Sequence, residues 1–196
     1  MKTKGEITRE KILECARELF NTKGFSATTI NDLVQATGMQ KGSLYFHFSG
    51  KDDIARAVLG QATSEFMNFL SEALAGDNPG VSLEQFFRCA LEKHLSTGFV
   101  GGCLFGNTAL EMSDSDPDFA AVIAKVFDQW SDKVAIVVAG AQKKGQIRTD
   151  ISSEALANHI IATIEGGIMM SRLKKDERPM RQCLETLRIT LELRVQ

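Results

Sequence analysis

The sequence predicts an all-α protein of about nine helices. Along most of the chain, apolar residues recur at intervals of three and four, the spacing of one face of an α-helix. The alternating runs and hairpin turns that are typical of β-strands do not appear. The three prolines, Pro79, Pro117 and Pro179, stand where the helical spacing breaks. With 196 residues and 43% hydrophobic side chains, the chain can bury a core that offsets the entropy of ordering.

Residues 1–51 are expected to form a small unit of three helices. The first helix is amphipathic and is expected from Thr8 to about residue 23, where Gly24 ends it. The second follows Thr28 and Thr29 and ends after residue 37. Gly38 then makes a tight turn, and the third helix begins near residue 40. Two helices joined by a short glycine turn have the geometry of a helix-turn-helix.

Longer helices are expected from residue 52 onward. The first covers 52–75 and ends in a loop that contains Pro79. The spacing of Ser82 and Gln85 predicts a capping box at the start of the next helix. That helix is expected to be interrupted by the glycine-rich segment 98–106.

Three long helices complete the expected fold. Asp116 and Pro117 suit the cap and first turn of a helix that runs to about residue 144. Two further helices are expected over about 152–174 and 179–195. We therefore expect two domains, which cover 1–51 and 52–196.

Charge is distributed unevenly between these two parts. The formal net charge of −2 by itself gives no hint of a nucleic-acid partner. Up to Lys51 the chain carries eight basic and five acidic residues, a balance of +3, which leaves −5 for the remainder. A modest excess is also typical of a solvated surface, so it supports a DNA-binding role without establishing one.

A motif with fixed spacing lies between residues 28 and 51. It combines Thr28-Thr29-Ile30, the run GMQKGSLYFHF over 38–48, and Lys51. Over about residues 6–60 the chain resembles the TetR/AcrR family of transcriptional regulators. The resemblance implies a homodimeric, cytoplasmic, ligand-responsive regulator of double-stranded operator DNA, most often a repressor that a small molecule releases. One departure is Gln40, because the family more often caps the recognition helix with serine or threonine.

Nine residues are expected at the DNA interface. Gly42 lacks a Cβ and lets the helix backbone approach DNA, while Lys41 and Lys51 can pair with phosphates. The Gln40 amide can pair with adenine. The resemblance implies phosphate contacts for Tyr45 and His47, although each residue alone could equally be a packing residue. The full set is Thr28, Thr29, Gln40, Lys41, Gly42, Ser43, Tyr45, His47 and Lys51.

The resemblance also implies a dimer interface and an effector pocket within 52–196. In similar proteins the last two helices pair with their counterparts, and Gly166 and Gly167 would permit close approach. The expected interface residues, some of which could instead face the intramolecular core, are Ile160, Ile164, Gly167, Leu184, Leu187 and Leu191. The expected pocket residues, many of which could simply be core, are Phe66, Phe69, Phe87, His94, Cys103, Phe105, Asn107, Glu111, Phe127, Trp130, Glu165 and Met169.

Cys103 allows other interpretations. The segment Gly101-Gly102-Cys103-Leu104 resembles an element found in a subset of these regulators, some of which sense electrophiles or oxidants. A helix start favours a thiolate, but a small buried residue would fit the same position. Two alternatives from other classes are a helical adaptor without DNA binding and a thiol enzyme that pairs Cys103 with His94 or His159.

Several function classes are disfavoured by the absence of their motifs. The sequence contains no nucleophile elbow, P-loop or metal-ligand spacing, so we expect neither catalysis nor a cofactor or metal. The four cysteines are widely separated and are expected to be reduced. No apolar stretch reaches the roughly 20 residues of a membrane span, and residues 1–9 are polar where a secretory signal would be apolar, so a cytoplasmic protein is expected.

Overall fold

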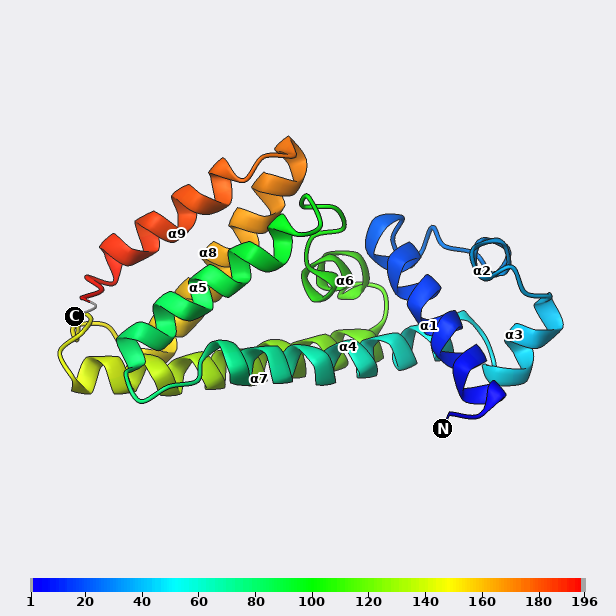
Figure 1. Cartoon of the computed structure of the whole chain (residues 1–196), viewed down its shortest axis with the longest axis horizontal. Coiled ribbons are helices and arrows are strands. Elements are labelled where there is room, and N and C mark those ends of the chain that lie inside the picture. Colours follow the sequence, from blue (N-terminus) through cyan, green and yellow to red (C-terminus); the bar gives the residue numbers. More distant parts are fainter. Residues whose placement is uncertain (1, 195–196) are drawn as a thin grey trace. The chain divides into compact units, whose positions relative to one another are not determined.

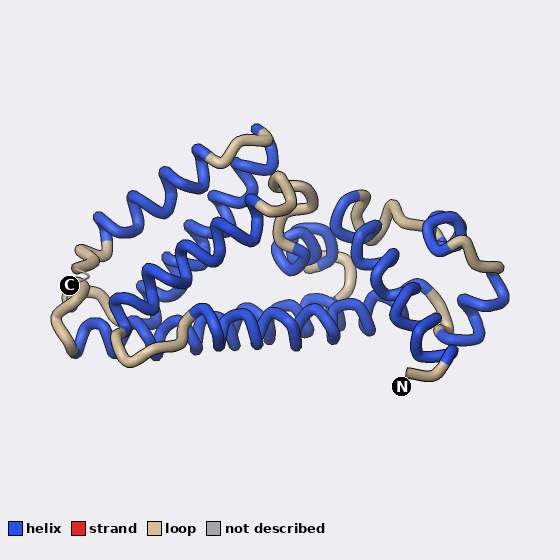
Figure 2. Tube along the Cα trace, in the orientation of Figure 1, coloured by secondary structure: helices blue, strands red, loops and turns tan. Residues whose placement is uncertain are grey.

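The computed structural model describes residues 2–194, and the fold in this range is built from helices (Figures 1 and 2). Nine helices and no strand occur between residues 2 and 194, which confirms the all-α class. No helix in that range is long and apolar enough to cross a bilayer. The chain divides into two compact units. The first unit extends to Glu65 and includes Leu104–Ala120, and the second comprises Phe66–Cys103 and the residues from Ala121 onward.

The first unit contains a helix-turn-helix and a helix from later in the chain. It is formed by α1 (Lys4–Thr22), α2 (Ile30–Thr37), α3 (Lys41–His47), the first part of α4 (Lys51–Ala73), α6 (Leu104–Met112) and the first turn of α7 (Pro117–Lys143). The second unit is formed by the remainder of α4 and α7 together with α5 (Pro79–Leu95), α8 (Ser153–Lys174) and α9 (Arg178–Thr190).

The start of α1 differs from the expected position at Thr8. The helix begins at Lys4 because Thr3 and Glu6 form a capping box. The Glu6 backbone N–H donates to the Thr3 hydroxyl at 3.2 Å, and the Thr3 backbone N–H donates to the Glu6 carboxylate at 2.7 Å. The Thr-x-x-Glu spacing was visible in the sequence and predicts this earlier start.

The expected cap at Ser82 is also wrong. Helix α5 begins at Pro79, and the Asn78 side chain accepts from the backbone N–H of Val81. Ser82 is buried inside the helix and donates its hydroxyl to the carbonyls of Ala75 and Asn78, at 3.1 and 3.2 Å. Asparagine followed by proline is the stronger start signal, because proline at the first helical position needs no N–H partner.

The ends of the last three helices follow the expected signals except at the C-terminus. Asp116 accepts backbone N–H groups at the start of α7, as expected, and Ser152 caps α8. Helix α9 ends at Thr190 rather than 195, and Glu192 adopts a positive φ of 52°. The backbone N–H of Arg148 donates to the Leu191 carbonyl at 2.9 Å, which holds the chain beyond α9. Residues 195–196 lie outside the described range.

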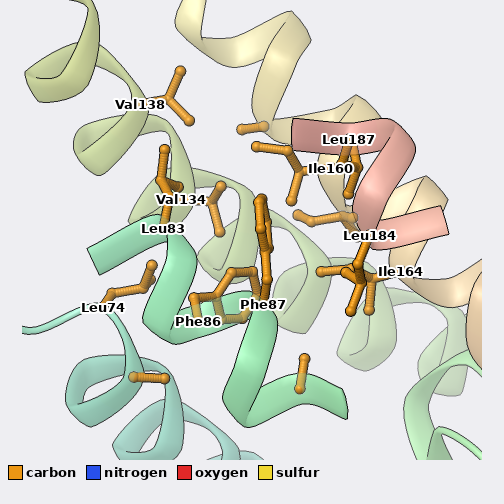
Figure 3. Packing of buried hydrophobic residues seen from close by; sticks show 14 of the residues in the cluster. Leu74, Leu83, Phe86, Phe87, Val134, Val138, Ile160, Ile164, Leu184 and Leu187 are labelled. Atoms are coloured by element: carbon orange, nitrogen blue, oxygen red, sulfur yellow. The ribbon is translucent and has the colours of Figure 1, made fainter. Parts of the chain in front are cut away.

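An apolar core from α5, α7, α8 and α9 organises the second unit. Figure 3 shows Phe86 and Phe87 of α5 among side chains of the other three helices. Both phenylalanines are fully buried. The labelled neighbours include Val134 and Val138 of α7, Ile160 and Ile164 of α8, and Leu184 and Leu187 of α9.

The residues expected at the dimer interface belong to this core. Their exposed fractions are 2% or less for Ile160, Ile164, Leu184, Leu187 and Leu191. Gly167 is buried, and a Cβ there would meet Cys183 and Met180 of α9 at 3.3 Å. These six residues therefore pack inside the chain, which is the alternative stated above. The apolar face of α8 is already covered by the other helices of the second unit. Any surface offered to a second copy uses other side chains.

Candidate functional site

Helix α3 is held against α2 by a left-handed glycine and two buried leucines. Gly38 ends α2 with a φ of 69°, a conformation that favours glycine. Leu33 of α2 and Leu44 of α3 are both buried. The Thr37 hydroxyl donates to the Leu33 carbonyl at 2.7 Å and accepts the backbone N–H of Met39 at 3.3 Å. The turn between the two helices is therefore closed by local hydrogen bonds.

The expected DNA-contact residues of α3 lie largely on one open face. Gln40, Lys41, Gly42 and Tyr45 are exposed, and Ser43 and His47 are half-buried. The Lys41 ammonium stands 6.0 Å from the Tyr45 ring centroid. Among residues 2–194, Gln40 caps α3 without a side-chain hydrogen bond, which leaves its amide available. These side chains can meet the floor and wall of a DNA groove.

The same face carries an aromatic residue that was not expected there. Phe46 is 85% exposed, and its ring meets the His47 ring edge-on at 5.2 Å. The helical spacing contained the signal, because Phe46 is two residues from buried Leu44 and therefore on the opposite side of the helix.

Thr28 and Thr29 stabilise the fold at the start of α2. Thr28 has no exposed surface and donates its hydroxyl to the Gly24 carbonyl at 2.6 Å. This side chain is not available to DNA. Thr29 is exposed, but its hydroxyl forms the N-terminal capping box of α2 with Asp32. Hydrogen bonds from Lys23 and Thr29 lower the pKa of Asp32 to about 2.

Lys51 points into the first unit rather than toward the open face of α3. Its ammonium donates to the Phe25 carbonyl at 2.9 Å and stands 4.3 Å from the Phe25 ring centroid. The phosphate contact expected for this residue would require the ammonium to leave both partners. The difference arises because the side chain of the first residue of α4 reaches back to the turn after α1.

Glu111 of α6 holds the same turn from a different helix. Its carboxylate accepts the backbone N–H groups of Phe25 and Ser26, at 2.9 and 2.7 Å. Burial raises the pKa of Glu111, but these hydrogen bonds outweigh burial and leave the pKa below its usual value. The turn is thus held by a carboxylate on its amides and by the Lys51 ammonium on a carbonyl. No local signal in the sequence indicates these contacts, because Glu111 lies 86 and 85 positions from Phe25 and Ser26.

Seven of the expected pocket residues belong to the second unit in addition to Phe87 and Met169. Trp130 meets the rings of Phe66 and Phe127, at centroid distances of 5.0 and 5.7 Å, and the Lys93 ammonium lies 4.6 Å from the Phe69 ring. His94 stacks on Phe99 at 6.3 Å. The seven residues are Phe66, Phe69, His94, Cys103, Phe127, Trp130 and Glu165.

This group contains polar atoms without partners in an apolar setting. Within the described part of the chain, neither the buried Nε1 of Trp130 nor the buried Oε1 of Glu165 has a hydrogen-bond partner. Burial raises the pKa of Glu165, and a hydrogen bond with Cys103 partly offsets the rise. Burial and the neighbouring Lys93 lower the pKa of His94 to about 4, so its imidazole is neutral at pH 7. These residues can therefore offer hydrogen-bonding groups from the Trp130 indole, the neutral His94 imidazole and the Glu165 carboxyl.

Of the other five expected pocket residues, three belong to the first unit and two to the second. Phe105, Asn107 and Glu111 belong to the first unit, where the Asn107 amide donates to the Asn21 side chain at 2.8 Å. Phe87 is in the core described above, which also contains Trp130, and Met169 is 58% exposed on α8. Residue type alone could not show which of these aromatic and polar residues belong to which unit. Their surroundings depend on contacts between segments that are distant in the chain.

Comparisons with known proteins match both parts of the chain. The family described as "Bacterial regulatory proteins, tetR family" matches residues 12–58, which include α2 and α3. The family described as "Tetracyclin repressor-like, C-terminal domain" matches residues 82–187. The chain belongs to the TetR family. Members of this family are DNA-binding transcriptional regulators and not enzymes, so α3 is the recognition helix of the helix-turn-helix.

Individual relatives cover nearly the whole chain. The HTH-type transcriptional repressor DhaR of Mycobacterium sp. strain GP1 is 28% identical over 178 residues, which cover 90% of this chain and 88% of the relative. A TetR transcriptional regulator from Chloroflexus aurantiacus is 31% identical with a TM-score of 0.86, covering 98% of this chain and 99% of that one. Regulatory protein TetR from Rhodobacter sphaeroides is 27% identical with a TM-score of 0.88, covering 94% and 98%.

Proposed function

We propose that this TetR-family protein is a homodimeric repressor that leaves its operator in the cytoplasm when a small molecule binds in the second unit. The repressor role is supported by the similarity to DhaR, which is named as a repressor. The observation that carries the ligand response is the pair of buried, unpartnered polar atoms on Trp130 and Glu165. A ligand that binds more tightly to the DNA-free conformation shifts the population away from the operator.

The outer face of α8 offers a surface on which two copies could pair. A single helix-turn-helix contacts one half-site, and a two-fold pair places two recognition helices about 34–36 Å apart on DNA. Exposed and half-buried residues of α8 recur at alternating intervals of four and three, the spacing of a helix-pairing seam. On α9 the exposed Gln182, Thr186 and Ile189 continue the same spacing. The α8 seam consists of Ala155, His159, Ala162, Gly166, Met169 and Leu173.

Oligomeric state tests this seam. Leu173 and Ile136 are both exposed leucine-sized side chains of the second unit, at 79% and 73%, but only Leu173 lies on the seam. Leu173→Glu is expected to shift the protein from dimer to monomer in sedimentation-velocity experiments, because it buries a charge at the interface. Ile136→Glu on α7 serves as the matched control and should remain dimeric. Equal behaviour of the two variants contradicts the seam.

The chemistry of the pocket residues defines a class of effector. Buried hydrogen-bonding groups are rarely left unpaired, and each unpaired group costs about 1–3 kcal/mol. The Trp130 indole N–H requires an acceptor, and the unpaired Oε1 of Glu165 can accept a hydrogen bond from a ligand. Rings of Phe66 and Phe127 line the neighbourhood of Trp130. We therefore propose an uncharged, mainly apolar molecule with a carbonyl or hydroxyl group.

Release from DNA tests the effector. The probe is a panel of uncharged ketones and alcohols, added to the full-length protein bound to the DNA upstream of its own coding region. Compounds that release DNA should also change the fluorescence of Trp130, the chain's single tryptophan. Glu165→Gln should keep DNA binding and lose sensitivity to these compounds. If the DNA migrates unchanged in a gel-shift assay at all protein concentrations in low salt, binding to this operator is contradicted.

Thiol sensing through Cys103 is the second candidate. Cys103 is half-buried and directly precedes α6, but its hydrogen-bond partner is the Glu165 carboxyl. A neighbouring carboxyl group does not favour the thiolate that reacts with electrophiles. The two candidates are separated by treating the wild-type protein and Cys103→Ser with N-ethylmaleimide and comparing their release from DNA. Release only when Cys103 is present supports covalent sensing, and equal behaviour supports the non-covalent effector.

A further inference from the structure

The outermost side chain of the recognition helix is apolar. Phe46 is 85% exposed, more than any other aromatic residue among the exposed large hydrophobic side chains of the described chain. Isolated apolar residues at a surface require no explanation in general. Phe46, however, lies on the element that enters the DNA groove, between exposed Tyr45 and half-buried His47.

The position of Phe46 on α3 is opposite to the core. Gly42 and Phe46 are four residues apart and share one face of the helix. Leu44 lies two residues from each of them and is 1% exposed, which places their face away from α2. Phe46 therefore projects where the helix comes nearest to the bases.

The space beside Gly42 is open. A Cβ added at Gly42 would meet no atom of the described residues within 4 Å. A helical side chain leans toward the N-terminus, over the preceding turn, and for Phe46 that turn contains Gly42. Gly42 thus leaves room for a small group on the same face of α3 as the exposed Phe46 ring. A small apolar group on the DNA fits this shape better than a phosphate or a hydrogen-bonding base edge.

We propose that Phe46 determines operator sequence by contacting the C5-methyl group of a thymine in the major groove, with the methyl seated beside Gly42. Thymine is the base that presents an apolar group in the major groove, and phenylalanine is among the side chains that contact it. Polar neighbours such as Lys41 and Tyr45 position the helix on the backbone. This inference rests on operator binding by the recognition helix and adds the residue that selects a base.

A methyl deletion on the DNA tests the contact directly. Duplexes that bind the full-length protein are first selected from a random library. Each thymine of a recovered half-site is then replaced singly by deoxyuridine, which lacks only the C5-methyl group. At one position per half-site the unmodified protein should bind deoxyuridine about fourfold more weakly, the factor for losing one buried methyl group. Phe46→Ala should bind thymine and deoxyuridine equally at that position.

A second exposed apolar residue supplies the control. Leu110 of α6 is 87% exposed, so Leu110→Ala removes a comparable surface side chain away from α3. Leu110→Ala should keep the fourfold discrimination, and both variants should melt at the temperature of the unmodified chain. If Phe46→Ala weakens binding at every site and keeps the thymine preference, or if no thymine shows a preference, the proposal is overturned. Failure to select any duplex overturns operator binding as well.

Discussion

Gly42 is a glycine that the fold itself does not require. Its φ is not among the positive values, and an added Cβ would meet no atom of the described residues within 4 Å. Glycine in a helix is less favourable than alanine by up to about 1 kcal/mol. A residue that weakens its own helix, on the face opposite buried Leu44, is explained by the approach of another molecule. We propose that DNA is that molecule, because glycine in a recognition helix allows the helix backbone to approach closely.

We expect Gly42→Ala to change stability and DNA binding in opposite directions. The added methyl should raise the free energy of unfolding by up to about 1 kcal/mol. It should weaken operator binding by about tenfold, or about 1.4 kcal/mol, because the helix can no longer approach closely. Gly60→Ala in α4 is the matched control, since its Cβ is also open and it should stabilise without altering affinity. Chemical denaturation measures the free energy of unfolding, and fluorescence anisotropy measures the affinity for DNA. An unchanged affinity of Gly42→Ala would contradict a close approach of DNA to Gly42.

Lys41 and Lys51 are expected to differ in the salt dependence of DNA binding. Exposed Lys41 can release a counterion from DNA, whereas the Lys51 ammonium donates to the Phe25 carbonyl. Lys41→Ala should therefore reduce the slope of log affinity against log salt concentration by about 0.9 per subunit. Lys51→Met should keep the slope and lower the melting temperature. A reduced slope in Lys51→Met would show that its ammonium reaches a phosphate after all.

Helix α6 contributes to the helix-turn-helix although it lies far away in the sequence. The Glu111 carboxylate pairs with the N–H groups of Phe25 and Ser26, in the turn that joins α1 to α2. Gly24 in this turn has a φ of 93°, and a Cβ there would stand 3.1 Å from the carboxylate. The close approach of α6 to the turn therefore depends on glycine at this position.

Glu111→Gln is expected to loosen this turn, because the amide can accept only one of the two N–H groups and presents its own N–H₂ to the other. The loss at neutral pH should be about 1 kcal/mol, since solvent screens a half-buried carboxylate. The folded-state pKa lies below the usual 4.5, so the carboxylate stabilises the fold above that value and its contribution disappears as pH falls through the lowered pKa. Melting temperatures of the two proteins should therefore converge in acid. A constant difference would mean that packing, not charge, holds the turn.

Helix order and most helix ends were predictable because their signals are local. Gly38, Asp116 and Ser152 terminate or cap helices as their residue types predict. The errors at Thr8 and Ser82 arose where two capping signals stood close together, and the one paired with glutamate or proline prevailed. No local signal could indicate that α6 packs with the first unit, since the contacts of Glu111 join residues 85 and 86 positions apart.

For the whole molecule, the expected boundary between residues 51 and 52 falls at the start of α4. The compact units instead divide α4 after Glu65 and bring Leu104–Ala120 to the first unit. A continuous helix carries no sequence signal for such a division, because helical periodicity continues through it.

The acid stability of the chain is expected to depend on His94. Burial and Lys93 lower the pKa of His94 from 6.5 to about 4, so the unfolded chain binds a proton in this range that the folded chain does not. The free energy of unfolding should therefore be fully maintained above pH 6.5 and fall as pH decreases toward 4, by at most about 1.4 kcal/mol per pH unit for one proton. His94→Gln, which cannot be protonated, should flatten this part of the profile in urea titrations. An identical profile in the variant would assign the acid loss to other groups.

The exposed face of α3 was predictable from the sequence, whereas the composition of the internal core was not. Periodicity and the motif over 28–51 determined the class of fold, the helix-turn-helix and the open face of α3, because a short helix places its side chains by residue spacing alone. Only the tertiary structure decided that Thr28 and Lys51 face inward, that Ile160 and Leu184 belong to the chain's own core, and that Trp130 and Glu165 bury unpaired polar atoms. An apolar or charged side chain on a helix can pack or pair with several kinds of neighbour. Which neighbour it contacts depends on segments that are distant in the chain.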